Sequence, residues 1–265
     1  MTPQPLSKLR ILITRDKFQA GSIRKLLARK GARVVAIPTI EIRPFPFDSQ
    51  VRLLLRKIQA YDWLVFSSTN AVSLFNSYFN KAGGDRRLLR KVKIACVGKA
   101  TAKALKSAGF KAEVVPKDFK QEGLVNAFRK IPLNHTKWLV CGAKEGRNVL
   151  RKFLERKGAK VTVWTLYENR IPRGTKQKLW RLFERSSGVD LLTFMSPSAA
   201  DHFYSLFTPA QHRKWLAEIP AAVIGPVTGA SVKKWGATVA VDPQSYTMSA
   251  LVDGIVKWAR KQKAH

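Results

Sequence analysis

The sequence predicts an α/β protein with two doubly wound parallel-sheet domains that arose by internal duplication. Apolar strand-like runs alternate with amphipathic helix-like segments, and the connections between them are short. Residues 135–171 also repeat the pattern of residues 8–44. A length of 265 residues with 45% apolar residues is sufficient for two hydrophobic cores of ordinary size.

The opening unit predicts a strand at residues 9–13, a helix around residues 21–30 and a strand at residues 34–37. Apolar residues recur at helical spacing within the helix, basic residues take the opposite face, and Gly31 marks its end. The second copy carries the same residue types at matching positions, and convergence explains this poorly. The matched pairs include Leu12 with Leu139, Arg24 with Arg151, Leu27 with Leu154, Gly31 with Gly158, and Glu41 with Glu168.

The units that follow recur in the same order. YDWLVFSSTNAVSLF at residues 61–75 matches VDLLTFMSPSAADHF at residues 189–203, and each predicts a strand, a hydroxyl-rich turn and a helix. The strands are expected to end at Phe66 and Phe194, and the helix N-caps to lie within residues 68–70 and 196–198. Residues 92–119 match residues 220–246, and further helices are expected at residues 122–128 and 249–255.

Strand-to-helix turns form the predicted functional surface. Ligands of open parallel sheets bind outside the carboxyl ends of the strands, where helix N-termini expose N–H groups. Gly, Ser, Thr and Asn dominate these turns, and such residues bind carboxylates or phosphates well. A Ser or Thr at a helix start also serves as an ordinary N-cap, so the prediction rests on six turns together. They are residues 14–17, 67–70, 98–101, 142–147, 196–198 and 225–228, and two such edges facing each other would form a cleft.

Charge is the strongest compositional signal. The chain has 49 Lys and Arg against 17 Asp and Glu, a net charge of +32. This balance predicts attraction of polyanions, although a solvated basic surface explains much of it equally well. Arg15, Lys17, Lys99 and Lys144 add positive charge at the turns themselves.

Several function classes lack their signatures. The four histidines are scattered, and the sequence contains no HExxH, paired CxxC, GxSxG or P-loop motif. The GxGxxG spacing is absent and acids are sparse at the turns, so no cofactor and no metal are expected. Two cysteines within apolar runs fit buried thiols in a reducing compartment. With no long apolar stretch or leader-like start, a cytoplasmic protein is expected.

Two proline-bearing segments, residues 41–48 and 168–174, occupy equivalent places in the repeats and mark the domain boundaries. Either each repeat folds separately, or the first βαβ segment of each exchanges between domains. Tyr167, whose partner in the first copy is Ile40, is a residue where the copies differ. A phenol beside basic groups could donate a proton or a hydrogen bond to a leaving oxygen, while the structural alternative is a half-buried aromatic at a strand end.

Taken together, these motifs resemble the uroporphyrinogen-III synthase family over nearly the whole chain. The resemblance is carried by the order and spacing of Thr14-Arg15, FSSTNAV at residues 66–72, VGKATAKAL at 97–105, EGL at 122–124, GAKVTVWTLYE at 158–168, FMSPSAA at 194–200 and IGPVTGASVKKWG at 224–236. It implies two α/β domains joined by a two-stranded linker, with the opening βαβ segment packing in the C-terminal half. The implied domains are residues 1–41 with 169–265, and residues 46–165, with linkers at residues 42–45 and 166–168.

The resemblance also implies a site. Tyr167 matches the family's tyrosine that assists loss of the hydroxymethyl oxygen, and Thr101 and Thr228 match its cleft threonines. Helix-start residues match its carboxylate binders. The predicted substrate-binding residues are Arg15, Ser68, Asn70, Gly98, Thr101, Lys144, Ser196, Ser198, Gly225 and Thr228.

The implied reaction is a cofactor-free lyase step in haem biosynthesis. Hydroxymethylbilane, a linear tetrapyrrole with eight carboxylates, is cyclised to uroporphyrinogen III with inversion of ring D and loss of water. A monomer is expected, with hand-over from hydroxymethylbilane synthase as a further expectation, and with neither a membrane nor a nucleic acid as partner. The alternative is a two-domain α/β binding protein for anionic ligands or nucleic acid.

Overall fold

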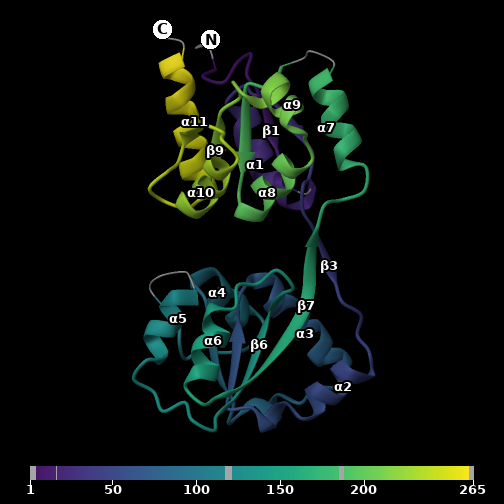
Figure 1. The fold of residues 1–265 in the computed structure, drawn as a ribbon, viewed down its shortest axis with the longest axis vertical. Coiled ribbons are helices and arrows are strands. Elements are labelled where there is room, and N and C mark those ends of the chain that lie inside the picture. Colours follow the sequence, from purple (N-terminus) through teal and green to yellow (C-terminus); the bar gives the residue numbers. More distant parts are fainter. Residues whose placement is uncertain (1–3, 16, 117–120, 185–187, 263–265) are drawn as a thin grey trace. The chain divides into compact units, whose positions relative to one another are not determined.

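The computed structural model describes residues 4–15, 17–116, 121–184 and 188–262 (Figure 1). The chain forms two compact units. Unit 1 contains residues 1–41 and 170–265, and unit 2 contains residues 42–169. Each unit is built on its own five-stranded sheet, and every strand pair for which a register is defined is parallel. The prediction of two doubly wound α/β sheets is confirmed.

The unit 1 sheet has the strand order β10-β9-β8-β1-β2. Its strands are β1 (Arg10–Ile13), β2 (Arg33–Ala36), β8 (Leu191–Phe194), β9 (Ala221–Val223) and β10 (Val239–Val241). One face is covered by α1 (Lys17–Arg29) and α11 (Met248–Gln262). The other carries α7 (Thr175–Glu184), α8 (Pro197–Ser205) and α10 (Pro226–Lys234). A short α9 (Pro209–Gln211) runs into a π-helical turn, η3 (His212–Leu216).

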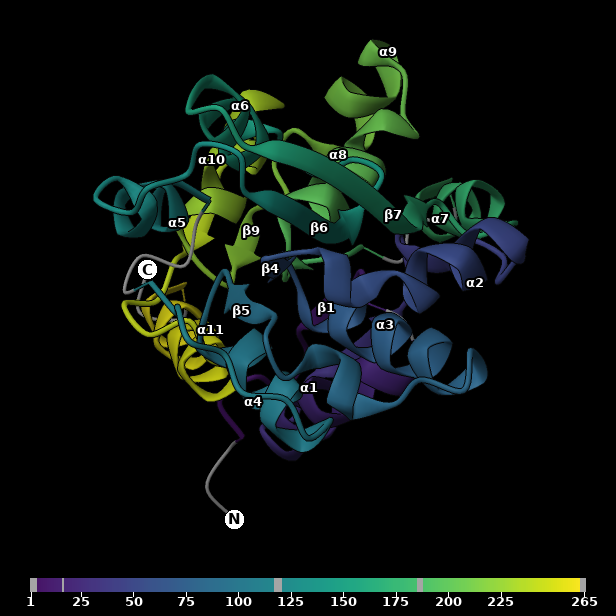
Figure 2. The same ribbon diagram turned by 90° about the horizontal axis from the view of Figure 1, so that it is seen from below.

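The unit 2 sheet has the order β3-β7-β6-β4-β5. Its strands are β3 (Glu41–Pro44), β4 (Trp63–Phe66), β5 (Lys93–Cys96), β6 (Lys137–Ala143) and β7 (Lys160–Arg170). Residues of α2 (Ser49–Arg56), α3 (Thr69–Lys81) and α4 (Lys99–Ser107) share one core, and those of α5 (Gln121–Phe128) and α6 (Val149–Arg156) share another. In Figure 2, α5 and α6 lie on one side of the unit 2 strands, and α3 and α4 lie on the other. Two 3₁₀ turns, η1 (Ile58–Ala60) and η2 (Arg86–Leu89), complete unit 2.

The opening βαβ segment of each repeat lies in the sheet of the other repeat. Strand β1 pairs with β8, and β6 pairs with β4. The segments expected to be linkers, residues 42–45 and 166–168, belong largely to β3 and β7 and are neighbours in the unit 2 sheet. The backbone N–H of Phe45 donates to the carbonyl of Leu166 at 3.0 Å.

Local sequence signals explain most element boundaries. Gly31 and Gly158 have φ values of +96° and +83°, so each stops its helix in the left-handed region that favours glycine. The first helix begins at Lys17, before the residue 21 expected from its apolar spacing. Helix α11 runs on to Gln262, beyond the expected end at residue 255, because its apolar face continues through Ala259.

Each sheet has an interior strand that is buried on both sides, β4 in unit 2 and β8 in unit 1. All four residues of β4 are buried, with Leu64 and Phe66 in one core and Trp63 and Val65 in the other, as the two-residue period of a strand requires. The same holds for the four residues of β8. Both cysteines are buried and free, which confirms the predicted buried thiols.

Candidate functional site

The carboxyl edge of each sheet carries the predicted turns. In unit 2 the hydroxyl of Ser68 caps α3 by accepting the N–H of Ala71 at 3.1 Å. In unit 1 the hydroxyl of Ser196 caps α8 by accepting the N–H of Ala199 at 3.2 Å. Gly98 and Gly225 are the N-cap residues of α4 and α10, and neither offers a side-chain cap. These helix starts therefore leave backbone N–H groups directed outward along the carboxyl edge.

Charge along the helices is strongly ordered. Among the helices described, acidic residues are missing from the first turns of α1, α2, α3, α4, α6, α7, α8, α10 and α11, and Glu122 of α5 is the exception. Last turns, in contrast, usually carry Lys or Arg. Helix N-termini attract anions and helix C-termini attract cations. The chain thus neutralises its helix C-termini and leaves most N-termini without a carboxylate of its own.

Tyr167 joins this edge in unit 2. Its side chain is 5% exposed, and its phenol oxygen lies 2.9 Å from the hydroxyl oxygen of Ser68. Tyr167 is on β7 and Ser68 follows β4, with β6 between the two strands in the sheet. The side chain of Tyr167 must therefore extend past the end of β6 to reach the start of α3. Two residues 99 positions apart in the sequence meet in one hydrogen bond.

The end of β6 is built to allow this approach. The register between β6 and β7 shifts between Gly142 and Ala143, so that Ala143 pairs with Tyr167. Ser67 donates both its N–H, at 3.1 Å, and its hydroxyl, at 3.2 Å, to the carbonyl of Cys141. A Cβ on Gly142 would lie 2.5 Å from the hydroxyl oxygen of Ser67. Glycine therefore permits the close contact between the ends of β4 and β6.

We expect Gly142→Ala to lower the free energy of unfolding by about 1–3 kcal/mol, because the new methyl group must displace the Ser67 hydroxyl. Urea titration followed by circular dichroism measures the change. Gly21→Ala is the matched control: nothing lies within 4 Å of a Cβ there, so alanine in the middle of α1 should stabilise by about 0.5–1 kcal/mol. Equal effects of the two substitutions would contradict the proposed role of Gly142.

Lys144 is tied to the same strand end. Its N–H donates to the carbonyl of Tyr167 at 2.8 Å, and its ammonium lies 3.7 Å from a carboxylate oxygen of Glu168. The Lys144 side chain is 63% exposed, so this ion pair contributes little stability. The ion pair nevertheless places the carboxylate of Glu168 beside the ammonium of Lys144, which was predicted to bind the substrate.

The remaining predicted residues lie on the same edges without joining the Tyr167 contact. In unit 2, Thr101 is buried within α4 and Asn70 is half-buried in the first turn of α3. In unit 1, Thr228 is buried in α10 and Ser198 is half-buried in α8. The guanidinium of Arg15 lies 3.4 Å from the sulfur of Met195.

Gly225 shows a different use of glycine. A Cβ there would lie 2.8 Å from the ring of Tyr246, a side chain that is 57% exposed. The absent side chain of Gly225 thus gives room to an exposed aromatic at the start of α10.

Ser67 and Gly142 lie within two of the predicted turns but were not among the individually predicted site residues, and Glu168 and Tyr246 lie outside those turns. Gly142 carried a usable signal, because an isolated glycine within an apolar strand run often marks a bulge or a close backbone approach. The other three lack a comparable signal, since their roles depend on which strand ends become neighbours.

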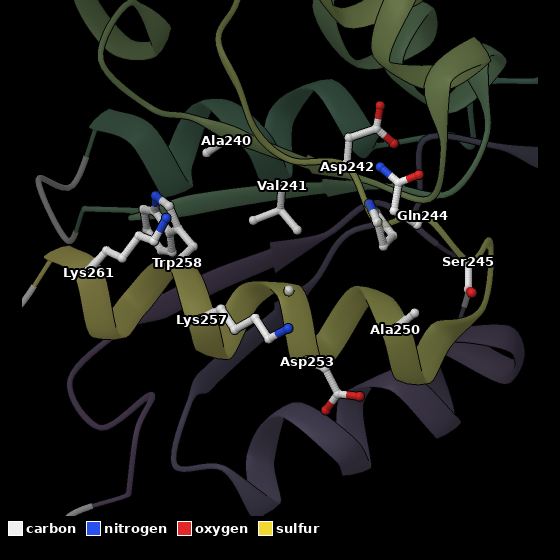
Figure 3. A pocket seen from close by; sticks show the side chains of 12 residues that line it. Ala240, Val241, Asp242, Gln244, Ser245, Ala250, Asp253, Lys257, Trp258 and Lys261 are labelled. Atoms are coloured by element: carbon white, nitrogen blue, oxygen red, sulfur yellow. The ribbon is translucent and has the colours of Figure 1, made fainter.

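Two pockets lie away from all the predicted residues. One, of about 540 Å³, runs between β10 and α11 in unit 1 and mixes Asp242 and Asp253 with Lys257 and Lys261 (Figure 3). Figure 3 shows Trp258 at the end near Ala240. The other, of about 380 Å³, is mostly apolar and lies beside α2 in unit 2. The predicted residues lie instead on the strand-to-helix turns, in the first turns of the helices that follow, and on β7.

The described residues contain no group of three His, Cys, Asp or Glu side chains that could hold a metal ion. Within the same residues, no helix is both long and apolar enough to cross a membrane.

The fold and these edges define a class of protein: a duplicated α/β chain of two units, each with helix starts suited to anionic groups. Within that class the chain belongs to the uroporphyrinogen-III synthase family, because the model described as Uroporphyrinogen-III synthase HemD matches residues 21–253. The chain is thereby assigned to porphyrin biosynthesis.

Individual relatives agree with this assignment. The chain is 30% identical over 272 residues to the Uroporphyrinogen-III synthase of Synechococcus elongatus, covering 98% of this chain and 99% of that protein. It is 27% identical over 254 residues to the Porphyrin biosynthesis protein HemD of Ruminiclostridium josui, covering 96% of this chain but only 49% of that longer protein. A crystal structure of mutant uroporphyrinogen III synthase from Thermus thermophilus matches 96% of this chain and 99% of its own, with a TM-score of 0.76 and 18% identity, and so supports the fold.

Proposed function

We propose that the protein cyclises hydroxymethylbilane to uroporphyrinogen III, with inversion of ring D and loss of one water molecule. The observation that carries this proposal is the Tyr167 phenol, held 2.9 Å from Ser68 at a carboxyl edge, in a chain of the uroporphyrinogen-III synthase family. A phenol at that place can donate a proton to a leaving hydroxyl group. The scarcity of acids at the helix starts suits a substrate with eight carboxylates.

The proposed reaction balances without a cofactor. Electron donation from the ring A pyrrole breaks the carbon–oxygen bond, and the departing hydroxyl takes the Tyr167 proton and leaves as water. The substituted carbon of ring D attacks the resulting methylene carbon and forms a spiro intermediate. Fragmentation and reclosure invert ring D, and the ring proton lost on rearomatisation returns to the phenolate of Tyr167.

The remaining residues act by holding the substrate. We propose that its carboxylates contact the helix starts at Ser68, Asn70, Gly98 and Thr101 in unit 2, with Lys144 nearby. In unit 1 the proposed contacts are Arg15, Ser196, Ser198, Gly225 and Thr228. Holding a flexible chain in one reactive geometry supplies much of the rate advantage in reactions of this kind. The protein must also favour the inverted product over the uninverted isomer, which forms without catalysis.

We further propose a cytoplasmic monomer that receives its substrate from hydroxymethylbilane synthase. Both cysteines are free and buried, which suits a reducing compartment. For the domains we propose residues 1–41 with 169–265, and residues 46–165.

An isomer assay tests the proposed function. Supplied with hydroxymethylbilane, the purified protein should yield mainly the type III product, which is separated from type I by chromatography after oxidation to porphyrins. Heat-denatured protein is the control and should yield the spontaneous type I isomer. Type I alone from the native protein would refute the proposal. Tight, steeply salt-dependent nucleic-acid binding would then favour the alternative of a polyanion-binding protein.

A further inference from the structure

The hydroxyl of Ser68 has two potential roles at the site, as a ligand contact or as a partner of Tyr167. A serine hydroxyl offers one proton and two lone pairs. One lone pair of Ser68 accepts the N–H of Ala71 at 3.1 Å, as an N-cap does. The contact with the Tyr167 phenol at 2.9 Å then uses either the other lone pair or the proton of Ser68.

These two arrangements have different consequences for Tyr167. If the phenol donates to Ser68, its proton is occupied and cannot serve a ligand. If Ser68 donates to the phenol oxygen, the phenol proton is free to point elsewhere. In the second arrangement the Ser68 hydroxyl accepts the N–H of Ala71 and donates its own proton to the phenol oxygen. No other acceptor for that proton is found within the described part of the chain.

The helix start favours the second arrangement as well. Ser68 lies at the N-terminus of α3, where the positive end of the helix dipole polarises the hydroxyl toward donating its proton. No acidic residue in the first turn of α3 counters that field. Tyr167 as a whole residue is also only 5% exposed, so little solvent competes for its phenol oxygen.

The duplication gives an internal comparison. Ser196 caps α8 in the same way as Ser68 caps α3. The residue that matches Tyr167 in the first copy is Ile40, which packs on the unit 1 core and has no hydroxyl. The serine cap is thus a shared feature of both repeats, and the hydrogen bond to a phenol occurs in one of them.

We infer that Ser68 is a positioning residue for Tyr167: it donates its hydroxyl proton to the phenol oxygen and so leaves the phenol proton for the ligand. This inference rests on the proposed function and changes the role of Ser68 within it. Ser68 acts through Tyr167 on the chemical step, and binding a substrate carboxylate is secondary. The Gly142 backbone keeps the two side chains within reach, because its lack of a Cβ preserves the packed end of β6.

A double-mutant cycle tests the inference with Ser68→Ala, Tyr167→Phe and the combined variant, all assayed for type III product. Ser68→Ala should lower kcat about 10-fold to 100-fold with KM changed less than about threefold, because the chemical step is affected. In the Tyr167→Phe background, the same substitution should lower kcat no more than about threefold. Ser68→Thr, which keeps the hydroxyl, should recover most of the kcat.

Asp48→Ala controls for the loss of a helix cap. Asp48 caps α2 in the same unit by accepting the N–H of Val51 at 2.9 Å. This variant should show a fall in melting temperature comparable with that of Ser68→Ala, and kcat should be unchanged.

Two results would overturn the inference. One is an equal loss of kcat from Ser68→Ala in both backgrounds, and the other is a rise in KM with kcat unchanged, which would make Ser68 a ligand contact. Failure of the proposed function is distinguished beforehand, because the unsubstituted protein would then give type I product alone.

Discussion

Tyr167→Phe is expected to lower kcat for type III product at least about 100-fold while the fold stays intact. The substitution removes one hydroxyl group, so the proposed proton donor is lost. The aromatic ring stays packed in the core of unit 2. The hydrogen bond to Ser68 contributes on the order of 1 kcal/mol, and its loss should shift the melting temperature by only a few degrees. Initial rates with hydroxymethylbilane measure the effect.

Tyr78→Phe is the matched control. Tyr78 belongs to the same unit, is 6% exposed, and donates its phenol hydroxyl to the carbonyl of Phe45. Burial raises the pKa of the Tyr78 phenol, so this group stays protonated and structural at neutral pH. Its removal should lower the melting temperature and leave kcat unchanged. Normal turnover by Tyr167→Phe would show that positioning of the substrate carries the reaction without proton donation from this phenol.

Trp138→Ala is expected to lower the free energy of unfolding by about 3–5 kcal/mol. Trp138 is fully buried on β6, stacks on Trp63 with ring centroids 5.1 Å apart, and meets Phe128 edge-on at 4.8 Å. Its indole N–H also donates to the hydroxyl of Thr136 at 2.7 Å. The substitution therefore leaves a large cavity against α5 and removes an aromatic stack between two central strands.

Urea unfolding followed by circular dichroism measures this loss. Val163→Ala on β7 is the control, because Val163 is 45% exposed and its truncation should change stability by less than about 0.5 kcal/mol. A loss below about 1 kcal/mol for Trp138→Ala would mean that the aromatic cluster of β4, β6 and α5 is not a main contributor to the stability of unit 2.

Sequence reasoning predicted the fold well because its signals are local. Short, mostly apolar runs predicted β4 and β8, helical spacing predicted α1, and the glycines Gly31 and Gly158 marked helix ends. The internal repeat then fixed the order of the elements. Helices α2 and α7 were not predicted, although their apolar residues recur at helical spacing, because they follow the proline-bearing segments, where the match between the two repeats is interrupted.

The site was predictable only in part. Tyr167 and Ser68 were each selected, one as the position where the repeats differ and the other as a helix cap. Their meeting was not predicted, because it requires β7 and β4 to lie two strands apart with a shifted register at Gly142 between them. The same reason explains Glu168, whose place beside Lys144 depends on the path of β7.

The exchange of βαβ segments constrains the order in which the chain can fold during synthesis. Strand β1 needs β8 as its neighbour, and the N–H of Arg10 binds the carboxylate of Asp190, 180 residues later. Unit 2 is one continuous segment, residues 42–169, and its sheet can close as soon as that segment has been synthesised. Until residues 191–194 have been synthesised, the edge of β1 that pairs with β8 has no partner. Contacts so distant in sequence slow folding, so the earliest residues of this chain are among the last to find their partners.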